Sequence, residues 1–319
     1  MPQILFVMDP IERIQVRKDS TFAMLLECQR RGWAPRICGL GDLYARDGAP
    51  FATAAAVRVF DDPQRWFEAE DARETALADF DVVFMRKDPP FDSEYLYATL
   101  ILDLAKARGT VVVNDPQALR DCNEKLATAW FPQCCVPTLV TRDIDRLRAF
   151  AAENGAVVVK PLDAMGGESV FRIPPGDPNA NVILETVTRH GTRTIMMQTF
   201  IPAVSEGDKR ILLIDGQPVP YALARVPAAG EARANLAAGG EGHGVALSAR
   251  DRWICEQVGP ALRRRGLLFV GLDVIGEWLT EINVTSPTCI RELDRLYGLN
   301  IAGLIMDAVA QRLAGRDGS

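Results

Sequence analysis

Short apolar runs alternate with longer amphipathic stretches over the first part of the chain. Residues 3–9, 81–86 and 110–114 are almost continuously apolar, which is typical of parallel strands covered on both faces. The stretches 21–31 and 94–108 place apolar residues at helical spacing. This alternation predicts an α/β unit with a doubly wound parallel sheet.

Residues that commonly begin and end helices lie at the ends of these predicted elements. Asp19 or Ser20 is a suitable N-cap for the first helix and Ser93 for the second, and Gly32 and Gly109 follow the two helices. A short strand is expected at 35–40. Residues 42–78 show no clear period, so we expect irregular structure there, with a weak helical signal around 66–78.

The pattern changes after about residue 122. Strands at 156–160 and 194–201 and helices at 145–153 and 181–190 predict a small α+β unit. Hairpins follow from about residue 202 onward. Asp215-Gly216 lies between two apolar runs, which is a strong signal for a two-residue hairpin turn.

The C-terminal part contains two further features. Apolar strands are expected at 267–275 and 278–284, with helices at 249–264, 289–297 and 300–314. Residues 228–244 are small and Gly-rich, which predicts a flexible loop. We therefore expect three domains: an N-terminal domain over 1–122, a central domain over 123–201, and a C-terminal domain over 202–319.

Length and composition agree with this division and exclude several classes of protein. The chain has 319 residues and a net charge of -6, which disfavours sequence-independent nucleic-acid binding. No apolar run reaches the ~18–20 residues of a membrane helix, and the N-terminus does not resemble a signal peptide. Seven scattered cysteines fit reduced thiols. We expect a cytoplasmic protein with no nucleic-acid or membrane partner.

Three oxygen-bearing side chains interrupt otherwise hydrophobic strands near the C-terminus: Asp273, Glu281 and Asn283. Buried carboxylates need a cation, and oxygen ligands without His or Cys favour Mg²⁺ or Mn²⁺ over zinc. Glu281 and Asn283 share one face of their strand. A strict two-residue turn would pair position 273 with 280 and would put Glu281 on the other face of the sheet. A metal site that includes Asp273 therefore predicts a bulge or a three-residue loop. The alternative is a carboxylate pair that contacts arginines at the sheet edge.

Two lysines are candidates for binding phosphate. Only six of the 36 basic residues are lysines, and a compact ammonium suits point-charge contact with phosphate. Lys160 ends a strand and precedes Gly166-Gly167, whose backbone N–H groups can bind anions. The alternative for the two glycines is a plain hairpin turn. Lys125 is a second candidate cation, or a solvated lysine on a helix.

Several arginines suit an anionic substrate or intermediate. Arg210 and Arg225 flank the predicted loop and Arg233 lies in it, an arrangement that suits closure over an anion. A plain surface loop is the alternative. Arg86 follows the strand at 81–86, at the end where open α/β sheets bind ligands. Its guanidinium could bind a substrate carboxylate. The alternative for this segment is a loop stiffened by its prolines, with a salt-bridged surface.

Several segments together resemble the bacterial glutathione synthetases, which are ATP-grasp ligases. The most specific are MRKDPPFD (85–92), VVKPLDAMGG (158–167), VGLDVIG (270–276) and LTEINVTSPTCIRE (279–292). The resemblance runs over essentially the whole chain in order. It implies an ATP-grasp fold with an N-terminal domain, a central lid and a C-terminal domain, and ligation of γ-glutamylcysteine to glycine through an acyl phosphate at the expense of ATP.

The resemblance also implies roles for particular residues. Those implied to contact ATP are Lys125, Lys160, Gly166, Gly167, Gln198, Ile201 and Asp208, with Asp208 at the ribose. Those implied to hold two Mg²⁺ ions, with Mn²⁺ as an alternative, are Asp273, Glu281 and Asn283. Those implied to act on the acyl phosphate and the tetrahedral intermediate are Arg210, Arg225 and Arg233. Those implied to bind the peptide substrate are Arg86, Ser286 and Thr288.

The family is commonly tetrameric, so a homo-oligomer is implied as well. Ala164 and Glu241 depart from the family pattern, in which glycine and arginine are usual.

Two other functions stay open: an ATP-grasp ligase with different substrates, and a nucleotide-binding regulatory protein without catalysis. The complete set of proposed metal ligands disfavours the latter. No GxGxxG motif follows the first strand, which disfavours a dehydrogenase.

Overall fold

The first sheet is built around a parallel centre. The computed structural model describes residues 1–165, 167–226 and 241–316. Strand β1 (Gln3–Val7) lies between β2 (Ala34–Cys38) and β7 (Val82–Met85), and β8 (Val111–Val113) lies beyond β7. All three pairings are parallel. The predicted parallel sheet is confirmed for these four strands.

Three helices accompany this sheet, and each begins at an aspartate. Their bounds are α1 (Ser20–Arg30), α2 (Ser93–Lys106) and α3 (Pro116–Asp121). Asp19 accepts a hydrogen bond from the Phe22 backbone N–H at 2.6 Å, which confirms one predicted cap. The second cap is Asp92 and not Ser93, because the Asp92 carboxylate accepts from the Tyr95 N–H at 2.9 Å.

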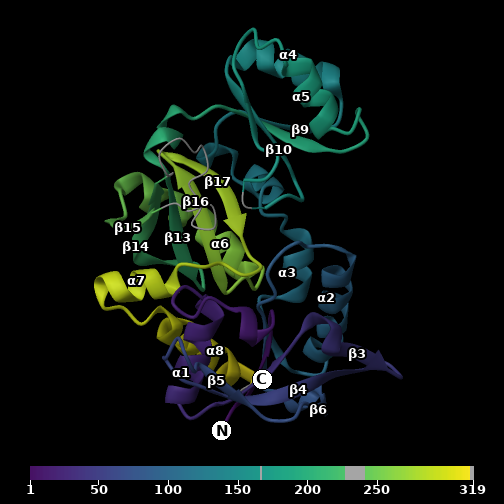
Figure 1. The fold of residues 1–319 in the computed structure, drawn as a ribbon, viewed down its shortest axis with the longest axis vertical. Coiled ribbons are helices and arrows are strands. Elements are labelled where there is room, and N and C mark those ends of the chain that lie inside the picture. The colour runs from purple at the N-terminus through teal and green to yellow at the C-terminus, as the bar shows by residue number, and fades with distance from the viewer. Residues whose placement is uncertain (166, 227–240, 317–319) are drawn as a thin grey trace.

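The prediction for residues 42–78 was wrong. The segment forms four strands: β3 (Leu43–Arg46), β4 (Ala49–Val59), β5 (Phe67–Ala69) and β6 (Arg73–Ala76). Strand β4 pairs antiparallel with β2 and extends the parallel sheet at the base of the molecule (Figure 1). Its burial alternates, but its alanines make that alternation invisible in hydropathy. Pairing with four neighbouring strands decides the conformation.

The second sheet is a small antiparallel unit at the top of the molecule in Figure 1. Its strands lie in the order β11 (Phe171–Ile173), β10 (Val157–Pro161), β12 (Ile195–Thr199) and β9 (Thr138–Thr141). Helices α4 (Ile144–Asn154) and α5 (Ala180–Val187) pack on it. The unit has a hydrophobic core of its own, which includes Leu147, Val157, Leu184 and Met197.

The third sheet is entirely antiparallel. Its order is β15 (Glu241–Ala246), β14 (Gln217–Val226), β13 (Asp208–Ile214), β16 (Phe269–Ile275) and β17 (Trp278–Asn283). Asp215 and Gly216 have φ values of 48° and 81°, which confirms the predicted turn between β13 and β14. The expected flexible loop at 228–244 falls outside the described residues up to 240. Its last four residues belong to β15, so the predicted C-terminal end of the loop was wrong.

The remaining helices close the C-terminal half. They are α6 (Ala249–Arg264), α7 (Ile290–Tyr297) and α8 (Ile301–Arg316). Short 3-10 helices connect other elements, at Ile11–Arg13, Leu40–Asp42, Leu77–Asp79, Leu126–Trp130, Pro132–Cys134 and Pro202–Glu206. Within the described ranges, none of the helices combines the length and apolar character needed to cross a membrane.

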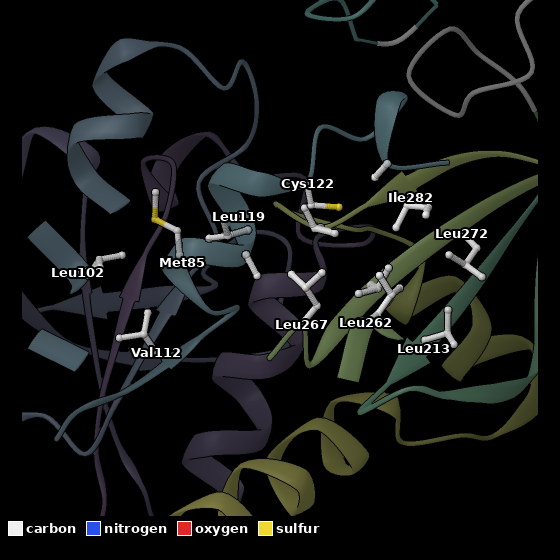
Figure 2. Close-up of a cluster of buried hydrophobic side chains, with 14 of the residues drawn as sticks. Met85, Leu102, Val112, Leu119, Cys122, Leu213, Leu262, Leu267, Leu272 and Ile282 are labelled. Carbon is white, nitrogen blue, oxygen red and sulfur yellow. The ribbon is translucent and has the colours of Figure 1, made fainter. Parts of the chain in front are cut away.

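The first and third sheets share two clusters of buried hydrophobic side chains. In Figure 2, Leu102, Val112 and Met85 of the first unit continue through Leu119 and Cys122 to Leu267 and Leu272 of the third. This shared burial makes the first and third sheets one packed body. The second sheet keeps a separate core.

Candidate functional site

Asp273 on β16 lies directly opposite Glu281 on β17. The register shifts between Asp273 and Val274, and Val274 pairs with Leu279, so Thr280 is the extra residue of a bulge. The Thr280 hydroxyl donates to the backbone carbonyl of Asp273 at 3.0 Å and fixes the bulge. The irregular register that the metal hypothesis predicts is therefore confirmed.

Asp273 is buried against two arginines. Arg210 Nη2 lies 2.8 Å from Asp273 Oδ2, and its Nε also donates to the carboxylate. Arg225 Nη2 lies 2.9 Å from the same oxygen. Burial alone would raise the pKa of Asp273, but the charges of Arg210 and Arg225 hold it below its usual range. Asp273 therefore stays ionised and orients both guanidinium groups.

Asp208 extends this row of alternating charges. Its carboxylate accepts from Arg225 Nε at 2.7 Å and from Arg225 Nη2 at 2.5 Å. The order in space is thus Arg210, Asp273, Arg225 and Asp208. Asp208 therefore forms a bidentate ion pair with Arg225. The resemblance implies a contact between Asp208 and the ribose, and it does not predict this ion pair.

Glu281 faces lysines instead of arginines. Its Oε1 lies 3.7 Å from Lys125 Nζ and 4.0 Å from Lys160 Nζ, although the two lysines come from separate segments. The Glu281 side chain is 26% exposed, whereas those of Lys125 and Lys160 are 4% and 8% exposed. The two lysines thus form a buried cationic pair beside an accessible carboxylate. This is the juxtaposition expected of a phosphate site.

Lys125 is not a solvated helix lysine. Its Nζ donates to the carbonyl of Ala164 at 2.6 Å and contacts the Glu124 carboxylate. Burial alone would lower the pKa of Lys125, but Glu281 and Glu124 hold it above its usual value. Burial lowers the pKa of Lys160, and the charge of Glu281 opposes that change. Lys160 Nζ also lies 3.3 Å from the carbonyl of Thr280.

Sequence reasoning missed Glu124, the carboxylate that pairs with Lys125. Burial and the neighbouring charge of Glu281 raise its pKa. The Glu124 carbonyl accepts a hydrogen bond from the Ile282 N–H at 2.8 Å, which ties this segment to β17. Its position directly before a candidate phosphate lysine was the one available signal.

The donor set fits a hard divalent cation. Asp273 and Glu281 supply carboxylate oxygens from neighbouring strands. Asn283 Nδ2 donates to the Gly271 carbonyl at 3.3 Å, so its Oδ1 is the atom able to bind a cation. Among the described residues no three His, Cys, Asp or Glu side chains form a metal-binding group. The set is two carboxylates and an amide, and a cation at Asp273 would share that carboxylate with Arg210 and Arg225, which already donate to both of its oxygens. Such a set leaves positions for phosphate oxygens or water, as magnesium sites do.

The candidate adenine contacts lie at the end of β12. Gln198 is buried, pairs with Val158 of β10, and donates from Nε2 to the Thr138 hydroxyl at 3.0 Å. Ile201 follows the strand. Gly167 has a positive φ of 78°, which suits a tight turn before β11. Gly166 lies outside the described residues, as does Arg233.

Arg86 and the Ser286–Thr288 turn are brought together. Arg86 is 5% exposed and contacts the loop that follows β17. Its Nη2 donates to the Pro287 carbonyl at 3.0 Å and its Nη1 to the Thr285 carbonyl at 3.4 Å, on either side of Ser286. The alternative of a salt-bridged surface is wrong for Arg86, although it describes the neighbouring Lys87, which pairs with Asp9 at 2.9 Å.

Two family models match the chain. Residues 3–120 match the model described as prokaryotic glutathione synthetase, N-terminal domain, and residues 124–298 match its ATP-grasp domain. The chain is 59% identical over 312 residues to the glutathione synthetase of Pseudomonas syringae pv. tomato, covering 98% of each chain. It is 53% identical over 313 residues to that of Vibrio cholerae serotype O1, again covering 98% of each.

Solved structures share the fold at much lower identity. D-cycloserine synthetase DcsG superposes with a TM-score of 0.69 at 15% identity, covering 97% of this chain and 99% of that one. The ATP-grasp ligase PsnB, complexed with a minimal precursor, Mg and ADP, gives 0.63 at 17% identity and covers 98% of each chain. These similarities establish the ATP-grasp architecture.

Proposed function

This chain belongs to the prokaryotic glutathione synthetase family, and from that membership we propose that it ligates γ-glutamylcysteine and glycine, forming glutathione, ADP and phosphate. The structural observation that supports this proposal is the pairing of Asp273 with Glu281 beside four buried cationic side chains. Two carboxylates with separate cationic partners suit an ATP polyphosphate and its counter-ion.

The two lysines are proposed to bind the phosphates of ATP. Lys125 and Lys160 already lie together, and an ammonium can follow a moving phosphate as a point charge. Gly166 and Gly167 are proposed to add backbone N–H groups. Gln198 and Ile201 are proposed to border adenine, and Asp208 the ribose, which would require Asp208 to share its carboxylate with Arg225.

Asp273, Glu281 and Asn283 are proposed to hold Mg²⁺, as two ions, with Mn²⁺ as an alternative. When bound, such a cation supplies charge that neutralises phosphate oxygens. The protein's own contribution is a set of ligands held in register by the Thr280 bulge. A cation at Asp273 would share that carboxylate with Arg210 and Arg225, which donate to both of its oxygens.

The arginines are proposed to stabilise the charge that develops on the reacting groups. A carboxylate is a poor acyl donor, so the cysteinyl carboxylate first takes the γ-phosphoryl group and ADP leaves. The glycine amine then attacks the carbonyl carbon, the carbon–oxygen bond to phosphate breaks, and the amine loses a proton. Arg210, with Arg225 beside it and Arg233 from the segment before β15, would stabilise the negative oxygens in both steps.

The peptide substrate is proposed to lie against the Ser286–Thr288 turn next to Arg86.

We further propose three functional domains, at 1–122, 123–201 and 202–319, with the central one acting as a lid. A homo-oligomer, and specifically a tetramer, is proposed from the family resemblance. All seven cysteines are unpaired, which supports a reducing, cytoplasmic location.

Phosphate release tests the proposed reaction. ATP and Mg²⁺ are supplied with γ-glutamylcysteine and glycine together, and then with each omitted in turn. We expect release only when both are present, with an equal amount of glutathione formed. Release that does not depend on glycine, or ATP binding without turnover, would contradict the ligase and favour other carboxylate and amine pairs or a regulatory role.

A further inference from the structure

Two neighbouring strands of the first sheet end in buried polar side chains that reach the third sheet. Arg86 directly follows β7, and Asn114 directly follows β8. The strands are adjacent and parallel, so both residues lie at the same edge. Arg86 is 5% exposed and Asn114 4% exposed. Buried polar groups must be paired, and all of the partners of Asn114 and two of the three partners of Arg86 are backbone atoms of the third sheet and its loop.

The side chain of Asn114 forms hydrogen bonds with the backbone at the start of β16 and directly after β17. Its Nδ2 donates to the Phe269 and Val284 carbonyls, each at 2.7 Å, and its Oδ1 accepts from the Phe269 N–H at 2.9 Å. One side chain thus satisfies three backbone groups at the place where these strands meet the first sheet. Asn114 therefore fixes the backbone at Phe269 and Val284. This edge of the first sheet positions the backbone of the third unit.

Arg86 makes the same kind of contact with the residues that directly follow Val284. Its Nε donates to the Thr21 hydroxyl at 3.1 Å, while Nη1 and Nη2 donate to the Thr285 and Pro287 carbonyls. Its Cζ lies 5.4 Å from the centre of the Phe269 ring. No carboxylate of the described residues lies within ion-pair distance of this guanidinium. The hydrogen bonds that it makes hold one turn against one helix start.

We propose that Arg86 is a positioning residue that fixes the Thr285–Thr288 turn, and that it does not bind a substrate carboxylate. Three of its five N–H groups, one on each nitrogen, already donate to protein acceptors, and the side chain is buried. Two of those acceptors bracket Ser286. The start of α1 also holds the residue that begins α7, shortly after the turn, because the Ile290 N–H donates to the Ser20 hydroxyl at 3.3 Å. The segment from Thr285 to Ile290 is therefore held by two side chains of the first unit, those of Arg86 and Ser20.

The position of this turn matters because it connects the proposed metal ligands to the proposed peptide site. Asn283 ends β17, the turn follows immediately, and α7 begins at Ile290. A displacement of ~1 Å at a substrate-positioning segment can cost about 10²-fold in rate. Loss of the Arg86 bonds should therefore slow turnover without changing what the site recognises.

The kinetic experiment uses the substrate itself to separate the two roles, and so it rests on the proposed function. The kcat/KM for γ-glutamylcysteine is compared with that for 4-aminobutanoyl-cysteine, which lacks only the free carboxylate of the glutamyl group. A positioning role predicts that Arg86→Gln lowers both values by about 10- to 100-fold, with their ratio unchanged. A ratio that falls toward one would mean that Arg86 binds this carboxylate, and would overturn the proposal.

A milder variant guards against misfolding of Arg86→Gln. Thr21→Val keeps the shape of the side chain and removes only the acceptor of Arg86 Nε. The proposal predicts the same unchanged ratio, with a smaller loss of a few-fold in both values. Wild-type values for Thr21→Val would count against the proposal.

Hydrogen–deuterium exchange tests the proposal without using activity. We expect faster exchange over 284–290 in both variants, by about tenfold or more in Arg86→Gln because its two carbonyl contacts are lost. Arg295→Gln is the control, since it removes an exposed arginine from α7 and should leave this segment unchanged. Unaltered exchange in Arg86→Gln overturns the positioning role. If the wild type makes no glutathione, the proposed function fails and the exchange result still decides this inference.

Discussion

Asp273 lies opposite Glu281 on neighbouring strands, and the two carboxylates have different cationic partners. Arg210 and Arg225 bind Asp273, whereas Lys125 and Lys160 face Glu281. The bulge at Thr280 makes this arrangement possible, because strict pairing through the turn would place Glu281 on the other face. The local backbone irregularity is therefore the feature that assembles the proposed metal ligands.

Thr280→Val tests whether the bulge serves the site. The variant keeps the shape of the side chain and removes the hydroxyl that donates to the Asp273 carbonyl. We expect a loss of about 0.5–1.5 kcal/mol in the free energy of unfolding, together with a fall in kcat as Glu281 loses its register. Urea unfolding and steady-state kinetics measure the two effects.

Thr110→Val is the matched control for this prediction. The Thr110 hydroxyl is also buried and also donates to a distant carbonyl, that of Leu77, at 2.9 Å. We expect a similar loss of stability with kcat unchanged. Equal kinetic effects in the two variants would mean that the bulge contributes only to the general stability of the fold.

Glu281→Gln tests the accessible carboxylate. The substitution removes the negative charge between Lys125 and Lys160 and one proposed ligand, while the size of the side chain is kept. We expect turnover to fall by about 10²–10³-fold, as for other groups that act on transition-state charge, with thermal unfolding close to that of the wild type. Glu277→Gln, an exposed residue in the turn of the same hairpin, should behave as the wild type. Wild-type turnover in Glu281→Gln would contradict the two-metal assignment.

Much of this architecture could be predicted from the chain, and the exceptions have physical causes. Continuous apolar runs identify β1 and β7 because parallel strands are buried on both faces. Carboxylates within apolar strands predict a metal site, and that site requires the irregular register that brings Asp273 opposite Glu281. Strand β4 was missed because its alternation is carried by alanines, so neighbouring strands decide its conformation.

The partners of charged side chains were the least predictable part of the site. The ion pair between Asp208 and Arg225 depends on a hairpin register that no local pattern reports. The carbonyl acceptors of Arg86 lie about two hundred positions further along the chain. The residue types at a site can be read from the sequence, whereas the choice between a protein partner and a substrate partner follows from tertiary packing.

Arg210→Ala should affect both stability and catalysis. Arg210 and Asp273 are buried, so removing the arginine leaves a carboxylate that only Arg225 compensates. We expect a loss of about 3–5 kcal/mol in the free energy of unfolding, and a fall in kcat of about 10²–10³-fold if Arg210 stabilises the reacting oxygens. Chemical unfolding and single-turnover kinetics provide the measurements.

Arg263→Ala is the control for burial. Arg263 also binds an aspartate, Asp215, at 2.9 Å, but its side chain is 62% exposed. Exposed pairs contribute only about 0.2–1 kcal/mol, so we expect a small loss of stability and normal kcat. A change in KM with normal kcat for Arg210→Ala would instead assign Arg210 to ground-state binding.

Glu27 should make the stability of the fold depend on pH on the acidic side. Its carboxylate accepts from Arg30 Nε at 2.7 Å and Arg31 Nε at 2.6 Å, which lowers its pKa from 4.5 to about 2, with the Arg30 hydrogen bond as the largest cause. The folded-state pKa lies below the unfolded value. The stabilisation is therefore complete above pH 4.5 and is lost as the pH falls through about 2.

Glu27→Gln removes this titration and so isolates it. Arg30 is 65% exposed, which screens the pair and limits the expected contribution of Glu27 to about 1 kcal/mol. The difference in unfolding free energy between wild type and variant should be largest near neutral pH and should shrink steadily between pH 4.5 and 2. Urea unfolding of both proteins across this range measures it. A difference that stays constant with pH would mean that packing of the Glu27 side chain, and not its charge, holds α1 against Asn300 and the start of α8.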